Sequence, residues 1–487
     1  MFDILTDIID SILKYIPGIE GPDKPLSLRE KLRWTLAIMV VYFMMFSIPA
    51  LGANTAQLKS PVLQLISIIF AARIGSLITV GIGPIVFSSI VIQLLSGAGV
   101  INIDMNDPEQ KGRFQGIQKT AAILLAFAEA YIFTATGYVP ILNSSLFAAV
   151  VFQLAIGAVF IIYLDEMMTK YGITSGINLF IAGGVAYSIV AGTINIILGE
   201  AIGAIQAGGA SAIPNAILAF GPFVFAIVVF LVSIYAYDIK VELPLVFSQM
   251  RGVGGRLPIP FLYVSVLPVI LATSFEESLQ VWLRFLAGTT GTFANLAKFL
   301  ALYSQTPQGL QLTGGLVYLI SPNFPLPYSA TYGGIGNYNT YLNFFMTSST
   351  KLYLPLGGII NVPEWMHVVV YAITLIILCI IFGKFWVDMT GQSSKHVADQ
   401  LQDVGWQIPG FRRDPRIVKS VLDKYIPTIT VLGSIFVALL AVVATLTGAV
   451  GTGMGILLTV GIMYMVYQQL EQEKVLDSYP ALNKMLS

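Results

Sequence analysis

The sequence contains few of the side chains on which most enzymes and metalloproteins depend. Its 487 residues include one cysteine, Cys379, and two histidines, His367 and His396. A single cysteine cannot form an internal disulfide, and the cysteine and histidines do not have the spacing of a metal site. The chain also lacks a glycine-rich loop ending in Lys-Ser or Lys-Thr, which cradles phosphate in nucleotide-binding proteins. The sequence therefore predicts no catalytic residues, no metal and no cofactor.

Charged residues are scarce as well. They make up 11% of the chain, whereas soluble globular proteins contain about a quarter. Hydrophobic residues make up 56%, so the chain is predicted to be an integral membrane protein. The 26 basic and 26 acidic residues give a net charge of zero. Only the distribution of charge along the chain can therefore be informative.

Ten apolar segments are long enough to cross a hydrocarbon core of about 30 Å. They are predicted near 34–53, 76–98, 120–138, 146–164, 176–198, 214–236, 259–275, 366–387, 427–447 and 453–468. Ten spans divide into two halves of five, 34–198 and 199–468, and inverted repeats of this kind place a pathway near the bilayer midplane. The predicted fold is thus all-α, with ten transmembrane helices in two halves.

Two further segments are apolar but do not suit a full span. Residues 1–17 place apolar side chains at helical spacing opposite acidic ones, which predicts an amphipathic helix on the membrane surface, within an N-terminal region 1–33. Packing of this helix against the rest of the protein is an equal alternative. Residues 57–72 are short and include a lysine and a proline, which favours a re-entrant half-helix.

Basic residues are distributed unequally between the two faces that these spans define. Five of the 26, Lys59, Arg73, Arg284, Lys298 and Lys351, fall on one face, and the remaining 21 fall on the face that carries both termini. Because short cytoplasmic loops are enriched in lysine and arginine, both termini are predicted to be cytoplasmic. The last residues, 469–487, then form a cytoplasmic tail.

Three connections are longer than a membrane hairpin requires. The cytoplasmic connections 238–257 and 390–425 are basic, which fits either ordinary membrane topology or docking of an acidic or nucleic-acid partner. The connection 276–365 on the opposite face is rich in Tyr, Asn, Thr and Gly, and its low charge favours an ordered external insertion. Asn143–Ser145 on that face is a weak glycosylation signal.

Few ionisable side chains fall inside the predicted spans, whereas ion-coupled transporters usually need them there. Glu129 lies within the third span, where it could be a proton relay or could bond to a neighbouring helix. Asp165 and Glu166 lie at a cytoplasmic end, where a cap or an ion pair is the ordinary role, and Lys384 lies near another such end. A solute carrier is disfavoured by this shortage.

The stretch "RIGSLITVGIGPIV" (73–86) places glycines and Pro84 in the middle of a predicted span. A proline inside a helix frees the carbonyl four residues earlier, here that of Val80. The pair Ile82 and Val86 is spaced by one helical turn, as is the pair of residues 177 and 181 in the fifth span. Ordinary close packing and the lining of a pore both explain such pairs, and spacing alone does not separate them.

Five motifs together resemble one family. They are "RIGSLITVGIGPIV" (73–86), "IIYLDEMMTKYGITSGINLFIAGG" (161–184), "YVSVLPVILA" (263–272), "PGFRRDP" (409–415) and "GTGMGILLTVGIMY" (451–464). In order and spacing they resemble the SecY family, the large subunit of the protein-conducting channel. The residues of these motifs are most similar to those of archaeal members. The resemblance covers nearly the whole chain, with the exception of 276–365.

The resemblance implies two inverted halves clasped around an hourglass pore. The positions that match the family's constriction ring are Ile82, Val86, Ile177, Ile181, Ile270 and Leu458. The segment 57–72 matches the plug, with hinges at Ser60, Pro61, Arg73 and Gly75. The lateral gate matches Ser88, Ser89, Ser265 and Val266. The family commonly has asparagine at the position of Val266, so this chain departs from the pattern there, and the two serines of the facing helix are expected to supply part of the polar contact.

The implied function is passage of secretory polypeptides across the cell membrane and release of transmembrane segments into lipid. The implied partners are a gamma-type (SecE-like) subunit, a beta-type subunit, the ribosome, the signal-recognition receptor, the nascent polypeptide and the lipid bilayer. Residues that match ribosome-docking positions are Arg251, Arg256, Arg412 and Arg413, although Gln249 stands where a second basic residue is often found. A ten-span secondary transporter and a structural membrane scaffold remain alternatives.

Overall fold

The computed structural model describes most of the chain. The described residues are 18–24, 26–54, 72–97, 108–209, 212–247, 254–264, 267–284, 293–306, 309–325, 338–355, 358–403, 406–407, 415–451 and 453–478. The predicted N-terminal helix and nearly all of the predicted plug lie outside them. So do the site residues Ser60, Pro61, Arg251, Ser265, Val266, Arg412 and Arg413.

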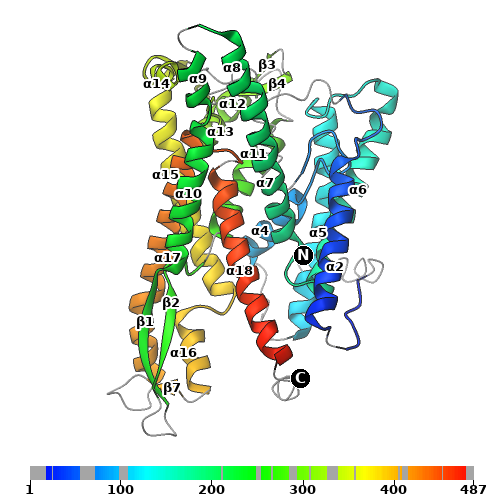
Figure 1. Ribbon diagram of the computed structural model, residues 1–487. Helices are drawn as coiled ribbons and strands as arrows, with labels where there is room; N and C mark the ends of the chain where they lie inside the picture. The colour runs from blue at the N-terminus through cyan, green and yellow to red at the C-terminus, as the bar shows by residue number, and fades with distance from the viewer. Residues whose placement is uncertain are drawn as a thin grey trace.

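The described chain is mostly helical, and its long helices run between two ends of the molecule (Figure 1). The long helices are α2 (Leu28–Ser47), α4 (Gly83–Gly97), α5 (Pro108–Ala135), α6 (Phe147–Tyr171), α7 (Gly176–Asn195), α10 (Gly221–Asp238), α11 (Leu267–Leu283), α15 (Glu364–Met389), α17 (Pro415–Leu446) and α18 (Gly453–Ser478). Among the described residues, six helical stretches meet the length and hydropathy of a membrane span: 112–135, 144–171, 176–206, 212–238, 364–388 and 418–446. These six stretches confirm that the corresponding predicted segments are apolar helices long enough to cross a membrane.

Shorter elements connect the long helices. The helical ones are η2 (Ser144–Leu146), η3 (Ile196–Ala201), α8 (Ile202–Ala207), α9 (Ala212–Ala219), α12 (Ala294–Leu300), α13 (Leu316–Ile320), α14 (Tyr338–Thr347) and α16 (Ser394–Asp403). The strands are β1 (Lys240–Phe247), β2 (Gly254–Pro260), β3 (Leu302–Thr306), β4 (Gly309–Gly314), β5 (Ser349–Tyr353), β6 (Ile359–Pro363) and β7 (Trp406–Gln407).

The two ends of the molecule carry different small sheets. At one end β1 pairs with β2 in an antiparallel hairpin, and β7 pairs with the far end of β1 through Val246↔Gln407 and Phe247↔Trp406. The hairpins β3–β4 and β5–β6 lie near the other end, and Figure 1 shows β3 and β4 far from β1 and β7. The two long basic connections therefore meet in one sheet, opposite the region predicted as an external insertion.

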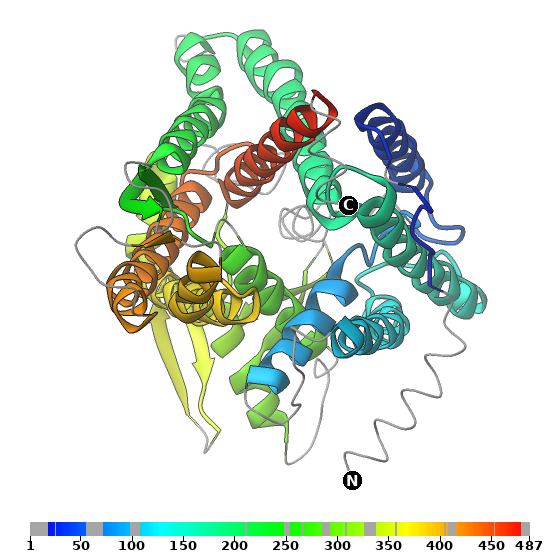
Figure 2. The same ribbon diagram turned by 90° about the horizontal axis from the view of Figure 1, so that it is seen from below.

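Seen along its length, the molecule has a central group of helices with others around it (Figure 2). In this view α4, α7, α11 and α18 lie innermost, and α11 packs against α4 while α18 packs against α7. The largest apolar cluster of the described residues joins side chains from all four of these helices with others from α2, α6, α10, α15 and α17. The chain up to α6 lies mainly on one side of this group, and α10, α15 and α17 lie on the other.

In two predicted spans the helix begins later than the sequence pattern indicated. The span predicted at 259–275 begins as strand β2 and a short turn, and its helix, α11, starts at Leu267 and continues to Leu283. Glu276 and Glu277 end the apolar run, and for this reason the pattern placed the boundary at 275. Glutamate is nevertheless a good helix former, so α11 continues for two turns into the region predicted as a connection.

The second wrong limit concerns the glycine-rich stretch. Residues 76–82 form turns, and α4 begins only at Gly83. Pro84 therefore occupies the first turn of α4, where a missing N–H leaves no helical bond unmade. The expectation that Pro84 frees the carbonyl of Val80 from a helical bond was wrong, because Val80 precedes the helix.

Candidate functional site

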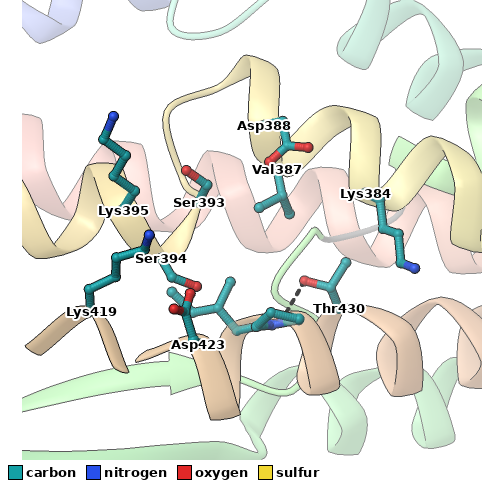
Figure 3. A pocket seen from close by; sticks show the side chains of 11 residues that line it. Lys384, Val387, Asp388, Ser393, Ser394, Lys395, Lys419, Asp423 and Thr430 are labelled. Carbon is teal, nitrogen blue, oxygen red and sulfur yellow. Dashed lines mark hydrogen bonds between the residues drawn. The ribbon is translucent and has the colours of Figure 1, made fainter. Parts of the chain in front are cut away.

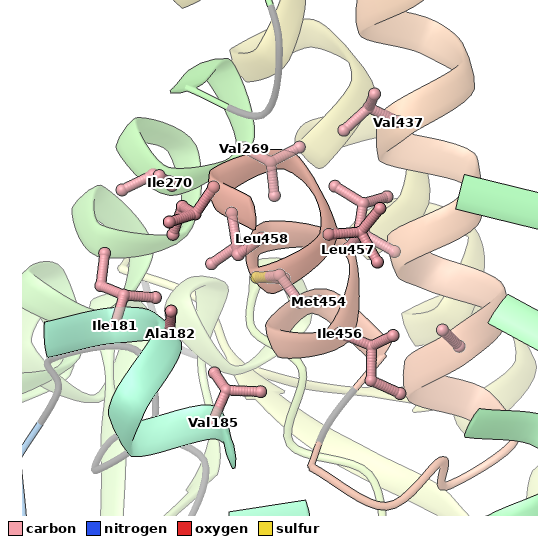
Figure 4. Packing of buried hydrophobic residues seen from close by; sticks show 14 of the residues in the cluster. Ile181, Ala182, Val185, Val269, Ile270, Val437, Met454, Ile456, Leu457 and Leu458 are labelled. Carbon is pink, nitrogen blue, oxygen red and sulfur yellow. The ribbon is translucent and has the colours of Figure 1, made fainter. Parts of the chain in front are cut away.

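The six residues predicted to form a constriction meet in one apolar cluster. Five of them are buried in the largest core cluster, and Ile177 packs against that cluster from its edge. Figure 4 shows Ile181 of α7, Ile270 of α11 and Leu458 of α18 gathered from three separate helices. Of the remaining two, Val86 lies in the first turn of α4, and Ile82 lies directly before this helix. The six side chains themselves are all aliphatic and offer no polar group to water or ions.

Turns before α4 set the position of Ile82. Gly81 has φ of 61°, a left-handed conformation that glycine adopts without strain. The carbonyl of Ile82 then accepts the N–H of Val86 at 3.1 Å, which closes the first helical turn. Ile82 and Val86 are thus one turn apart, as predicted, although Ile82 stands at the helix boundary. Gly157 of α6 allows these turns to come close, because a Cβ there would lie 1.8 Å from the carbonyl oxygen of Leu77.

The start of α7, which carries Ile177, is held by α6. The Asp165 carboxylate accepts the N–H of Ile177 at 2.9 Å, so it caps one of the free N–H groups at the helix start. Gly176 makes this possible, since a Cβ there would lie 2.7 Å from the Asp165 Cα. Glu166 bonds to Lys119 at 2.7 Å and to Lys170 at 3.0 Å. The prediction that these two acidic residues form a cap and an ion pair is confirmed.

The predicted gate helices α4 and α11 pack directly against each other. The rings of Phe87 on α4 and Trp282 on α11 are stacked at 5.9 Å between centroids. Ser88 and Ser89 each donate a hydrogen bond to the carbonyl of Ile85 at 2.9 Å, within their own helix. Each hydroxyl therefore donates its hydrogen bond inside α4. Among the described residues, neither serine makes the expected polar contact across the gate.

Further out along α11, polar side chains that sequence reasoning did not select line the same contact. Glu276 and Glu277 are buried, with exposed fractions of 1% and 2%, and Arg284 is 8% exposed. The Arg284 guanidinium carbon lies 4.8 Å from the ring centroid of Tyr138, which follows α5. The sequence contains two adjacent glutamates, Glu276 and Glu277, directly after an apolar run. The hydropathy pattern placed the end of a span there and did not indicate a buried polar site.

Glu129 of α5 is also buried, with an exposed fraction of 2%. Neither of its carboxyl oxygens has a hydrogen-bond partner among the described residues. The expectation of a hydrogen bond to a neighbouring helix is therefore not met. Cys379 is buried and free, as predicted.

The three-stranded sheet of β2, β1 and β7 positions one of the predicted docking residues. Arg256 on β2 forms an ion pair with Glu242 on β1, with a nitrogen–oxygen distance of 2.7 Å. The hydrogen bond from Arg256 lowers the pKa of the Glu242 carboxyl. The other three predicted docking residues, Arg251, Arg412 and Arg413, lie outside the described residues.

A cavity of about 310 Å³ lies beside this sheet, between the ends of α15, α16 and α17 (Figure 3). Lys384, Lys395 and Lys419 line it together with Asp388 and Asp423. The negative charges of the two carboxylates partly offset the positive charges of the lysines, so the cavity is lined by charges of both signs. No group of three or more His, Cys, Asp and Glu side chains in the described part of the chain could hold a metal ion.

At the opposite end, one buried polar group ties the region that holds the hairpins β3–β4 and β5–β6 to α15. The Nδ1 atom of His367 lies 3.1 Å from the Glu364 carboxylate, and its Nε2 atom lies 3.0 Å from the carbonyl oxygen of Ser321. Thr350 of β5 donates to the same carboxylate, and so does Tyr318 of α13, at 3.3 Å. These bonds fix β5 and α13 against the start of α15, which fits an ordered external module.

The comparisons with known proteins agree with these features. The SecY family model matches residues 76–467. The chain is 37% identical to the protein translocase subunit SecY of Methanocaldococcus jannaschii and 36% identical to that of Methanococcus vannielii. Each comparison covers 98% of this chain and at least 98% of the relative.

Solved structures show the same similarity. One, described as the structure of a protein conducting channel, is 36% identical, with a TM-score of 0.77 over 96% of this chain and 98% of the other. Another, described as Sec61 in the canine ribosome-channel complex from the endoplasmic reticulum, is 35% identical, with a TM-score of 0.74 and the same coverage. The chain is therefore a multi-pass membrane protein and a member of the SecY family.

Proposed function

We propose that this chain is the pore-forming subunit of a protein translocation channel, and that its ten membrane segments form two inverted halves around an hourglass pore. The observation that carries the proposal is the apolar cluster shared by α4, α7, α11 and α18, helices far apart in the sequence, in which Val86, Ile181, Ile270 and Leu458 are buried. Secreted polypeptides pass through this constriction. Transmembrane segments leave sideways into lipid.

The chemistry of the constriction suits this work. An aliphatic ring excludes ions because water leaves a narrow apolar passage, and it presents no polar group that would retain a passing chain. In the proposed channel the six residues Ile82, Val86, Ile177, Ile181, Ile270 and Leu458 form that ring. The ring opens around a polypeptide and closes after it.

A plug formed by 57–72 covers the ring from outside in this proposal. Its second hinge, Arg73–Gly75, leads into turns that are bonded to the end of α2. The Ala50 N–H donates to the Gly75 carbonyl at 2.8 Å, and the Leu77 N–H donates to the Ile48 carbonyl at 3.0 Å. Gly75 has φ of 86°. The chain after the hinge is thus held against the end of α2. Gly75 tolerates the sharp change of backbone direction that a hinge requires.

The lateral gate lies between α4 and α5 on one side and α11 and α15 on the other. A segment of about 20 apolar residues gains free energy by leaving the pore for lipid, whereas a charged residue at its centre costs about 2.5 to 3.5 kcal/mol. Opening of the gate lets each segment partition according to this balance. Ser88, Ser89, Ser265 and Val266 lie along it in the proposal.

The cytoplasmic sheet is the proposed docking surface for a ribosome, and the canine relative was solved in a ribosome-channel complex. Arginine makes paired hydrogen bonds to phosphate, which suits Arg251, Arg412 and Arg413 at the tips of the two connections. Gamma-type and beta-type subunits and the signal-recognition receptor are the other proposed partners. Both termini are cytoplasmic in this arrangement, and the membrane is the cell membrane.

The proposal is tested by crosslinking from the ring. A photoreactive residue at position 82 of the channel, reconstituted with its small subunits, is exposed to a nascent chain stalled on a ribosome. Crosslinks to the translocating part of the chain are expected. The same probe at position 377, on the exposed face of α15, serves as the control. Equal crosslinking from both positions would contradict a central passage.

A further inference from the structure

Two adjacent carboxylic acids are buried in the outer half of α11 without the partners that such groups need. Both carboxyl oxygens of Glu276 and one of Glu277 have no hydrogen-bond partner among the described residues. Burial of a polar group without a hydrogen bond is costly, and ionisable residues inside membrane segments mark functional sites by default. The two buried acids therefore do not stabilise the fold, and their presence calls for a functional explanation.

The two side chains leave α11 about 100° apart, as consecutive residues of a helix do. Glu276 lies near Tyr371 and Cys379 of α15. Glu277 lies on the same face of α11 as Gln280, near Tyr138, which follows α5, and Tyr303 of β3, and it also lies near Tyr371. Glu277 therefore lies at the contact between the two sides of the proposed gate.

Few groups around Glu277 could complement a carboxylate. Gln280 lies beside it one turn further along α11, and Arg284 is engaged over the ring of Tyr138 at 4.8 Å. The phenols of Tyr138, Tyr303 and Tyr371 also lie near it, and Glu129 lies elsewhere on α5. The facing helix α4 has no titratable residue. The closed contact thus leaves part of the Glu277 carboxyl unsatisfied.

The depth of this residue is set by α11. The Tyr303 hydroxyl donates to the carbonyl of Gln280 at 2.5 Å, which fixes the end of α11 to the external hairpin β3–β4. Glu277 stands seven residues beyond the ring residue Ile270, or about 10 Å further along the helix. It therefore belongs to the outer half of the gate.

We propose that Glu277, with Glu276 behind it, is a specificity-determining residue of the lateral gate that favours segments carrying a lysine or arginine in their outer third. The proposal rests on the lateral gate of the proposed function. A segment that enters between α4 and α11 replaces the closed contact, and a cation at the matching depth gives Glu277 its missing partner. Charge-assisted hydrogen bonds of this kind are the strong ones. An entirely apolar segment leaves the carboxyl unsatisfied.

The test uses the channel with its small subunits in phosphatidylcholine vesicles and two ribosome-stalled nascent chains. One chain carries an apolar segment of about 20 residues, and its twin has one lysine in the outer third. Photocrosslinking measures the fraction of each segment that reaches lipid and the fraction that contacts α4 or α11. The variants are Glu277→Gln, Glu277→Asp and Glu276→Gln, and the control is Glu471→Gln, on the exposed end of α18.

The measured quantity is lipid release of the lysine segment relative to its apolar twin. This ratio is expected to fall by roughly tenfold in Glu277→Gln, since an ionic hydrogen bond contributes that order of discrimination. It should fall less in Glu276→Gln, recover in Glu277→Asp and stay constant in Glu471→Gln. Normal release of the apolar twin shows that each variant is folded.

The possible failures are distinguishable. An unchanged ratio in Glu277→Gln overturns the assignment of Glu277 while the gate itself stands. A fall of equal size in Glu471→Gln, or no recovery in Glu277→Asp, also overturns it, because the charge at position 277 is then not the cause. If neither segment contacts α4 or α11 in any channel, the proposed lateral gate is wrong.

Discussion

The Arg284 guanidinium at the end of α11 lies over the ring of Tyr138, 4.8 Å from its centroid. The two residues belong to opposite sides of the proposed lateral gate, because Tyr138 follows α5. The neighbouring stack of Phe87 on Trp282, at 5.9 Å, crosses the same boundary. Among the described residues, two aromatic contacts rather than the serines of α4 thus join the two sides of the proposed gate.

Loss of the Arg284–Tyr138 contact is expected to weaken gate closure. A largely desolvated cation–π pair contributes about 1 to 2 kcal/mol, so Arg284→Gln and Tyr138→Leu should each lower the thermal unfolding temperature. A double-mutant cycle should give a coupling energy of about 1 kcal/mol. The pair Lys298 and Tyr353, at 5.7 Å in the predicted external insertion, is the matched control. Additive effects of the two gate substitutions would contradict a direct contact.

Gly157 and Gly112 are expected to respond to alanine in opposite directions. At position 157 a Cβ would lie 1.8 Å from the Leu77 carbonyl oxygen, in backbone that cannot yield cheaply. Gly157→Ala should therefore destabilise the protein by about 1 to 3 kcal/mol and displace the turns that position Ile82. At position 112 nothing lies within 4 Å, and Gly112→Ala should stabilise α5 by about 0.5 to 1 kcal/mol. Thermal unfolding in detergent measures both changes.

Reversal of charge in the two basic connections 238–257 and 390–425 is expected to weaken ribosome binding. Arg251→Glu combined with Arg412→Glu should lower the affinity and reduce its dependence on salt, because fewer phosphate contacts remain to release counterions. Arg256→Ala should have a smaller effect, since this arginine is already paired with Glu242 at 2.7 Å. Co-sedimentation with ribosomes at several salt concentrations tests this. Unaltered binding of the double variant at physiological salt would remove these connections from the docking role.

The sequence was sufficient for much of the architecture. Apolar length alone located the helices that became α5, α6, α7 and α15, because a long run of such residues has few other stable arrangements in a membrane protein. The family resemblance brought together Ile82, Ile181, Ile270 and Leu458, which lie far apart in the chain and share one buried cluster. Spacing alone could not have done so, since it relates only residues on the same helix.

The errors have local causes. Gly83 and Pro84 read as a break within a helix, but the same two residues also suit a helix start, and only the turns at 76–82 decide between these readings. Glu276 and Glu277 read as the end of a span, because hydropathy treats any charge as a boundary. Whether a buried acid is paired depends on neighbouring helices, so neither these residues nor Glu129 could be judged from the sequence.

The central claim is that six aliphatic residues seal the channel, and ion conductance of the reconstituted complex tests it most directly. Replacement of Ile82 and Ile177 together by glycine removes two side chains from the ring, so the closed channel is expected to leak ions across a planar bilayer. The matched control is Ile377→Gly, on the exposed face of α15, which should remain tight. Conductance of the double variant no greater than that of the control would contradict the ring.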